Sequence, residues 1–155
     1  MYEGEWKNDI PFGRGRLVLE DNSVYEGNFV NGTKHGEGRY TWSDQKTFYK
    51  GEWQYDTMEG RGEFQYADGR RYFGDFKENM FQGNGVFIWQ DGSKYVGEFC
   101  YNKKHGKGVY EWSDGRKFEG WWDRGLREGQ GCFILQNGHS KKGVWRADKR
   151  LAWCK

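Results

Sequence analysis

Long hydrophobic runs are missing from this sequence of 155 residues, and proline and cysteine are scarce. The mean hydropathy is -1.13, and Leu, Ile and Val are few, which argues against a membrane-spanning helix and a thick aliphatic core. The single proline, Pro11, leaves almost the whole backbone free to donate hydrogen bonds, as an extended sheet requires.

The three cysteines, Cys100, Cys132 and Cys154, are odd in number and have no CxxC spacing. Such cysteines favour a reduced, intracellular protein over a disulfide framework or a zinc site. Residues 1–6 include two glutamates and no apolar run, so they do not resemble a secretory signal. We therefore expect a cytoplasmic protein, and we predict no bound metal or cofactor.

Glycine and aromatic residues are abundant instead, with 25 Gly, 9 Trp, 10 Tyr and 11 Phe. Glycines recur every 23 or 24 residues, and a second glycine follows each of the first six after 11 residues. The first set is Gly4, Gly27, Gly51, Gly74, Gly97, Gly120 and Gly143, and the second is Gly15, Gly38, Gly62, Gly85, Gly108 and Gly131. Six full repeats and a partial seventh thus cover residues 1–145, and residues 146–155 are predicted to be a C-terminal tail or cap.

Each repeat has the pattern of two short strands. Tyr25 and Phe29 flank Gly27 with polar residues between them, which is the period-2 alternation of a half-buried strand. After the second glycine, aromatic residues such as Phe64 and Tyr66 again fall at even offsets. Antiparallel pairing of successive strands predicts an all-β, single-layer meander of hairpins that is elongated, twisted and solenoid-like.

Turn residues between the strands predict the register. Four loops contain the hairpin signals Asp68-Gly69, Asp91-Gly92, Asp114-Gly115 and Asn137-Gly138. A two-residue turn would pair Phe64 with Phe73 and place the aromatic residues on opposite faces. A three-residue loop instead pairs Phe64 with Tyr72 and Gly62 with Gly74, so that one face collects the aromatic residues. We favour the three-residue loop.

One interval is 24 residues long, and its loop has Asp44-Gln45 where the others have Gly or Asn second. We expect the extra residue to preserve the pairing parity. We also expect it to remove the need for a positive φ angle in this loop.

These motifs resemble the MORN-repeat family, whose consensus is close to Tyr-x-Gly-x-aromatic, His-Gly-x-Gly and Asp-Gly. Residues 25–29 followed by 35–38, and residues 95–99 followed by 105–108, show this consensus. Lys141 departs from it, because it replaces the aromatic residue before Gly143. The resemblance implies tandem MORN β-hairpins over nearly the whole chain.

The resemblance also implies three kinds of function. Proteins of the family serve as cytoskeletal, ciliary or membrane-junction scaffolds, and several oligomerise. Binding to phosphoinositides or to a membrane surface is a second function attributed to the family. A third is a regulatory region of a larger enzyme, since MORN arrays precede catalytic domains in some lipid kinases and a histone methyltransferase.

Candidate catalytic and metal-binding residues do not form a cluster. His35 and His105 occupy equivalent positions three repeats apart, so roughly 29 Å should separate them. No glycine cluster matches the GxxxxGK[ST] loop or opens a helix that could bind phosphate. Most acidic residues fall on outward-facing positions of a flat meander, which provides no enclosed cleft for paired carboxylates. We therefore expect a protein that is not an enzyme.

The aromatic face is the predicted partner-binding site. A single-layer sheet is not expected to cover so long a face with its own side chains, and Tyr and Trp are enriched at binding hot spots. We expect a helical or extended segment of a protein partner to bind there, within a cytoskeletal, ciliary or other large assembly. The predicted residues are Tyr25, Phe29, Tyr49, Trp53, Phe64, Tyr72, Phe76, Phe87, Tyr95 and Phe99. The uncovered edge strand at residues 2–6 also favours a homodimer through a terminal repeat.

The C-terminal part is the basic part of the chain. Residues 78–155 contain 14 Lys and Arg against 9 Asp and Glu. This excess leaves a solvated face and an acidic partner or anionic lipid as alternatives, and nucleic acid is favoured less. The candidate basic residues are Lys103, Lys104, Lys107, Arg124, Arg127, Lys141 and Lys142.

Overall fold

The structure is a computed structural model that describes residues 1–155, and every regular element in it is a strand. The chain divides into two compact units, Met1–Met80 and Phe81–Lys155. The first unit contains β1 (Tyr2–Lys7), β2 (Ile10–Val18), β3 (Val24–Val30), β4 (Thr33–Thr41), β5 (Phe48–Gln54), β6 (Thr57–Gln65) and β7 (Arg71–Lys77). The second contains nearly all of β8 (Met80–Ile88), then β9 (Lys94–Cys100), β10 (Lys103–Glu111), β11 (Lys117–Asp123), β12 (Leu126–Ile134), β13 (Ser140–Arg146) and β14 (Lys149–Trp153).

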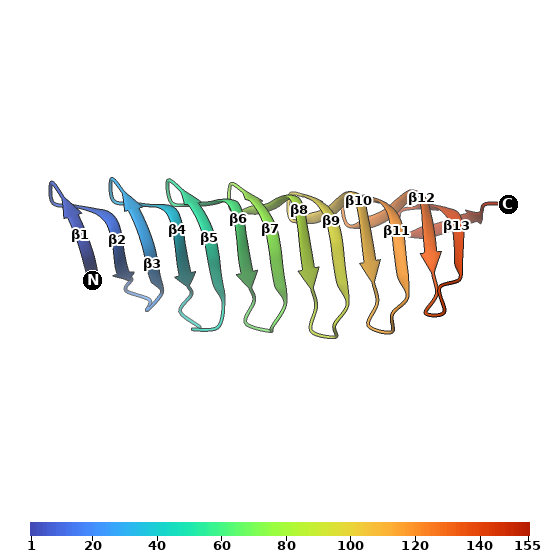
Figure 1. The fold of residues 1–155 in the computed structure, drawn as a ribbon, viewed down its shortest axis with the longest axis horizontal. Coiled ribbons are helices and arrows are strands. Elements are labelled where there is room, and N and C mark those ends of the chain that lie inside the picture. Colours follow the sequence, from blue (N-terminus) through green and yellow to red (C-terminus); the bar gives the residue numbers. More distant parts are fainter. The chain divides into compact units, whose positions relative to one another are not determined.

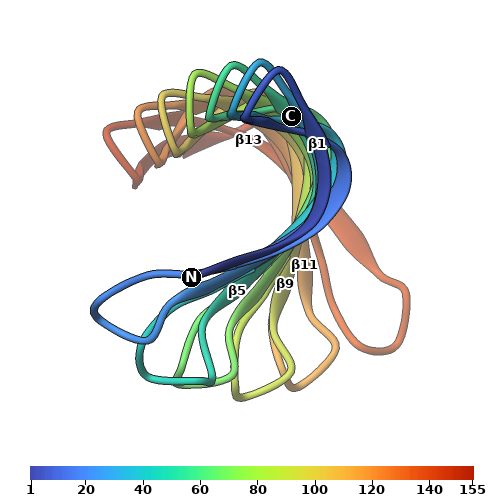
Figure 2. The ribbon, with the colours of Figure 1, turned by 90° about the vertical axis from the view of Figure 1, so that its left-hand side faces the viewer.

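Consecutive strands within each unit are neighbours and pair antiparallel (Figure 1). This arrangement confirms the predicted all-β meander of hairpins. The individual strands are curved along their length, as the view along the strand stack shows (Figure 2). The structure contains no helix long and apolar enough to cross a membrane.

The repeating glycines face one another across the strands. Gly27 pairs with Gly15 on one side and with Gly38 on the other, and the corresponding pairs recur in later repeats. Phe64 pairs with Tyr72 and Gly62 with Gly74, which confirms the register expected from a three-residue loop.

The three-residue loops have the expected geometry. In the loop of residues 67–69, the Tyr66 N–H donates to the Arg70 carbonyl at 2.9 Å, and the φ angle of Gly69 is 94°. The longer loop around Gln45 keeps the pairing of Tyr40 with Tyr49, as expected. The prediction that this loop needs no positive φ angle was wrong, because the φ angle of Gln45 is 60°. The Gln45 N–H donates to the Trp42 carbonyl at 2.9 Å. Gln45 therefore keeps the left-handed conformation although the loop is one residue longer.

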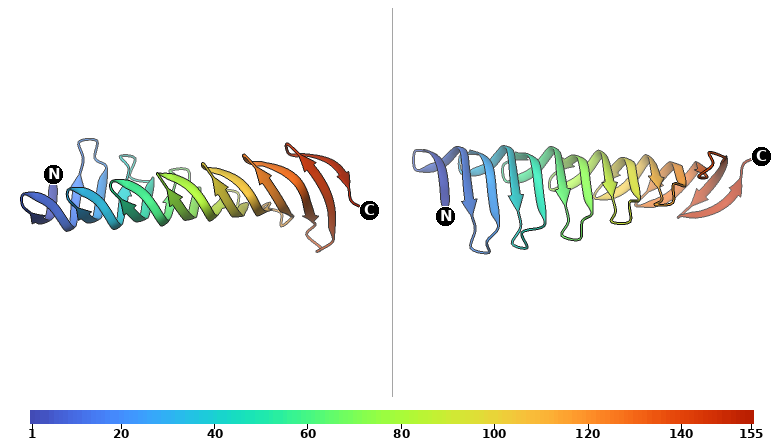
Figure 3. Two further views of the ribbon diagram at one scale, coloured as in Figure 1. Left: turned by 90° about the horizontal axis from the view of Figure 1, so that it is seen from above. Right: turned by 60° about the horizontal axis from the view of Figure 1, so that its bottom comes forward.

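Two-residue turns connect the strands at the other end of the hairpins. Both residues of these turns have positive φ angles, as in Tyr55 (46°) and Asp56 (68°), which is the type I′ geometry that matches strand twist. The last such turn, Ala147-Asp148, connects β13 to β14 (Figure 3, red). The boundary predicted at residue 145 therefore falls inside β13, and residues 149–153 continue the hairpin pattern as β14.

Tyrosine side chains lie flat over the glycine pairs and form the core. The ring of Tyr25 covers Gly27 and Gly38, and its hydroxyl donates to the Asn28 carbonyl at 2.8 Å. Tyr49, Tyr72 and Tyr95 repeat this contact in their own repeats. These four tyrosines are fully buried. Glycine is needed beneath them because a side chain there would occupy the space of the ring.

Candidate binding surface

Strand register assigns each side chain to one of two faces of the sheet. The aromatic face bears the residues at the parity of Tyr25 and Phe29, and the opposite face bears those at the parity of Glu26 and Asn28. Glu52, Glu63, Asp75 and Glu98 lie on the opposite face, as the register predicts. Two of these glutamates are structural, since Glu52 accepts from the Arg61 N–H and Glu98 from the Lys107 N–H at bulges in the strands.

Most of the predicted partner-binding rings are buried by other side chains of the chain itself, so they are not the accessible part of this face. Nine of the ten residues are 0 to 8% exposed, and only Phe64 is half-buried. The buried nine are Tyr25, Phe29, Tyr49, Trp53, Tyr72, Phe76, Phe87, Tyr95 and Phe99. Edge-to-face packing explains the burial: the Tyr49 ring lies 5.0 Å from that of Trp53 and 4.8 Å from that of Phe76. A direct role of these rings in binding stays a prediction.

A second set of aromatic rings on the same face is only half-buried. We call it the outer ring row, and its members are Tyr40, Trp42, Phe64, Tyr66, Trp89, Tyr110, Trp112 and Phe133. Neighbouring repeats connect through it, because the ring centroids of Trp42 and Phe64 lie 5.4 Å apart. In the second unit, Trp112 lies 5.6 Å from Phe133. The alternating pattern places these rings correctly, but most were not among the predicted site residues.

Cations lie against the rings of this face. The Lys34 ammonium is 5.4 Å from the centroid of Trp53 and 5.6 Å from that of Tyr40. Lys104 occupies the same position three repeats later, where it lies 4.4 Å from Trp122 and 4.9 Å from Tyr110. Burial lowers the pKa of the Lys104 ammonium below its ordinary value. The aromatic face therefore carries positive charges beside its accessible rings.

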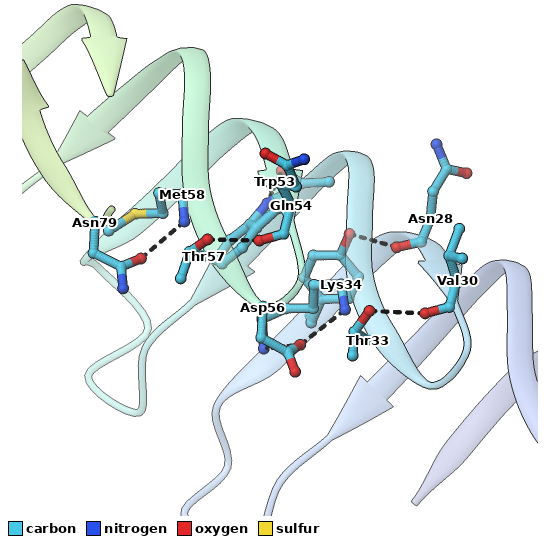
Figure 4. A network of polar contacts seen from close by, with 12 residues as sticks. Asn28, Val30, Thr33, Lys34, Trp53, Gln54, Asp56, Thr57, Met58 and Asn79 are labelled. Carbon is cyan, nitrogen blue, oxygen red and sulfur yellow. Dashed lines mark hydrogen bonds and ion pairs between the residues drawn. The ribbon is translucent and has the colours of Figure 1, made fainter. Parts of the chain in front are cut away.

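Side chains from the two-residue turns connect successive repeats (Figure 4). The Lys34 N–H donates to the Asp56 carboxylate at 2.8 Å, and the Met58 N–H donates to the Asn79 side-chain oxygen at 2.8 Å. The Phe81 N–H is bound by Asn102 in the same way. The turn residues Asp56, Asn79 and Asn102 thus each accept a hydrogen bond from a backbone amide of the preceding repeat, a contact that sequence reasoning missed.

We expect Asn79→Ala to lower the free energy of unfolding by about 1 to 3 kcal/mol, because the part-buried Met58 N–H loses its acceptor. Asn79→Asp should cost less, since Asp56 fills the equivalent position with a φ of 68°. Urea denaturation measures both changes. Equal stability of Asn79→Ala and the unchanged protein would contradict a structural role for this contact.

The predicted basic residues do not form one patch. Lys104, Arg127 and Lys141 lie on the aromatic face, whereas Lys103, Lys107 and Lys142 have the opposite parity, and Arg124 lies in a turn. Lys107 and Lys142 line an open hollow of about 790 Å³ on the opposite face. A flat anionic surface could therefore contact only part of the set at once.

The titratable groups do not gather into a metal-binding cluster. No three His, Cys, Asp or Glu residues are grouped so that they could hold a metal ion. His105 lies 3.5 Å from the Asp123 carboxylate, and both side chains are about half exposed. The three cysteines are free thiols.

Comparison with known proteins identifies the repeat. The sequence model of the MORN repeat matches residues 2–24, 25–47, 49–70, 72–94, 95–115 and 118–140. Alsin from Rattus norvegicus is 36% identical over 83 residues, which are 51% of this chain and 5% of Alsin. MORN repeat-containing protein 3 from Xenopus laevis is 33% identical over 72 residues, which are 43% of this chain and 30% of that protein. The chain thus matches only a small part of these relatives.

A solved structure shares the fold. The TCP domain of Drosophila melanogaster SAS-4, in complex with a proline-rich motif of Ana2, has a TM-score of 0.57 and 12% sequence identity. The match covers 86% of this chain and 72% of that chain. At this identity the similarity shows the fold alone.

Proposed function

Since this chain belongs to the MORN-repeat family, we propose that it is a non-enzymatic module that binds an extended, acidic segment of a protein partner within a larger assembly. The outer ring row carries this proposal. Its rings are accessible, they continue from repeat to repeat within each unit, and cations lie on the same face.

An extended segment suits this row better than a helix does. Equivalent rings of successive repeats are separated by two strands, or about 9.6 Å at the usual strand spacing. That distance corresponds to about one turn of an extended segment in the polyproline II conformation, which has three residues per turn and rises about 3.1 Å per residue. Side chains three residues apart in such a segment point the same way and could reach Trp89 and Trp112 in turn, while its carboxylates pair with nearby cations.

Membrane-surface binding is the second candidate function. The basic excess of residues 78–155 supports it. The division of the basic residues between two faces favours a protein segment instead, because a segment can bind one face without requiring the other.

The test uses peptides selected from a phage-displayed library on the purified chain, followed by titration against variants. The double variant Trp89→Leu, Trp112→Leu should weaken binding by about 30-fold, the loss typical of a binding hot spot. Leucine is a tolerated residue here, because Leu135 occupies the equivalent position in the sixth repeat.

Trp121→Leu is the matched control, since Trp121 is 47% exposed and lies on the opposite face. It should leave peptide affinity unchanged. Selected peptides that bind the double variant normally, or that lose affinity only in Trp121→Leu, would contradict the proposed surface. Flotation with phosphatidylserine vesicles, lost on substitution of Lys103, Lys107 and Lys142, would support the membrane alternative.

A further inference from the structure

Turn carboxylates on the aromatic face perform two tasks at once. Asp56 accepts from the Lys34 N–H at 2.8 Å and pairs with the Lys34 ammonium at 3.2 Å. Asp148 likewise accepts from the Arg127 N–H at 3.3 Å and pairs with the Arg127 side chain at 2.7 Å. In these two cases the turn of the next repeat thus supplies the carboxylate that pairs with the cation.

Lys104 has the same position but not the same partner. The equivalent turn residue of the next repeat is Gly125, which has no side chain to accept from the Lys104 N–H or to neutralise its ammonium. Four rings surround this ammonium, with centroids at 4.4 Å for Trp122, 4.9 Å for Tyr110, 5.7 Å for Trp89 and 5.9 Å for Tyr95. The rings hold the charge in place without neutralising it.

The space that a turn carboxylate would occupy is open. A Cβ atom built on Gly125 would meet no atom within 4 Å. The nearby Asp148 is already paired with Arg127, so two cations share one carboxylate here. Burial lowers the pKa of the Lys104 ammonium, and the attraction of the shared Asp148 carboxylate offsets this effect only in part.

We propose that the position left open by Gly125 is a carboxylate-binding site, in which an Asp or Glu side chain of the partner pairs with Lys104 as Asp56 pairs with Lys34. This inference rests on the proposed function and places one anchor of the acidic segment in the fifth repeat. The partner carboxylate binds the ammonium within the aromatic cage and accepts from the Lys104 N–H. Among the second to sixth repeats the site occurs in the fifth alone. Met58 and Phe81 replace the cation in the third and fourth repeats, and Lys34 and Arg127 already pair with turn carboxylates.

The test titrates an octaglutamate peptide, with octaglutamine as the uncharged reference, against the full chain and three variants. Lys104→Met removes the cation and should fold, since Met58 fills the equivalent position. Gly125→Asp supplies a carboxylate within the chain, and Gly125→Asn supplies a turn residue of the same shape without charge. Both residue types occur at the equivalent turn position, with φ angles of 68° in Asp56 and 65° in Asn79.

Octaglutamate should bind about tenfold more weakly to Lys104→Met and to Gly125→Asp. Gly125→Asn should weaken binding less than Gly125→Asp does, because its amide can accept from the Lys104 N–H, as Asn79 does from the Met58 N–H, but cannot neutralise the ammonium. At neutral pH, Gly125→Asp should also melt at a higher temperature than Gly125→Asn. Equal octaglutamate affinity in all four proteins, or no binding to the unchanged chain, would overturn the site. Loss of phosphatidylserine vesicle binding in Lys104→Met, without peptide binding, would overturn the assignment of a protein carboxylate.

The single variant Trp112→Leu separates the two proposals, because Trp112 belongs to the outer ring row and is not one of the four rings around Lys104. Octaglutamate affinity that needs the outer ring row but not Lys104 would overturn the carboxylate site and leave the proposed function standing. Affinity that needs Lys104 but not the outer ring row would support the site and overturn the proposed surface.

Discussion

Gly62→Ala should lower the free energy of unfolding by about 3 kcal/mol, the upper end of the cost of overpacking a core. A Cβ atom at this position would lie 2.5 Å from Cε2 and 2.6 Å from the hydroxyl oxygen of Tyr49. The ring cannot move aside cheaply, because it is fully buried and its hydroxyl donates to the Glu52 carbonyl at 2.7 Å. Guanidinium denaturation followed by tryptophan fluorescence measures the loss.

Gly69→Asn is the matched control for this prediction. Gly69 lies in a three-residue loop, where an added Cβ would meet nothing within 4 Å. Asn22 fills the equivalent loop position with a φ of 69°, so asparagine fits the left-handed geometry. We expect a change below about 1 kcal/mol. Similar stability of Gly62→Ala and Gly69→Asn would show that the Tyr49 ring does not need the glycine beneath it.

Trp53→Ala should lower the free energy of unfolding by about 3 to 5 kcal/mol, as expected when a buried aromatic side chain is truncated. Trp53 is 6% exposed, its ring lies 5.5 Å from that of Tyr25, and its indole N–H donates to the Gly38 carbonyl at 3.0 Å. Equilibrium denaturation should show this loss before any binding assay is interpreted.

Trp53→Phe is the conservative variant, because Phe29 and Phe76 occupy the same position in neighbouring repeats. It should cost about 1 kcal/mol, mainly through the lost indole hydrogen bond. If Trp53→Ala denatured like the unchanged protein and yet lost partner binding, the ring would be a binding residue and not a core residue. Binding tests on the outer ring row avoid this ambiguity, because those rings are only half-buried.

The turn chemistry shows where sequence reasoning stops. The Asp-Gly loops indicated a three-residue connection correctly, because glycine at the left-handed position is a local property of the chain. Gln45 adopts the same φ region without that signal, since its N–H is held by the Trp42 carbonyl. Tyr55-Asp56 also forms a type I′ turn without Asn-Gly, and the Asp56 contact to Lys34 in the preceding repeat stabilises it.

The sequence alone determined the strands, the pairing of Phe64 with Tyr72 and the single aromatic face, because side-chain parity and loop length are local and repeat every 23 residues. Only the tertiary structure decided which rings are buried, since burial depends on how rings of neighbouring repeats pack edge to face. The structure also divided the basic residues between two faces and left Lys104 opposite Gly125. Charge neutralisation depends on contacts between repeats, and composition does not contain that information.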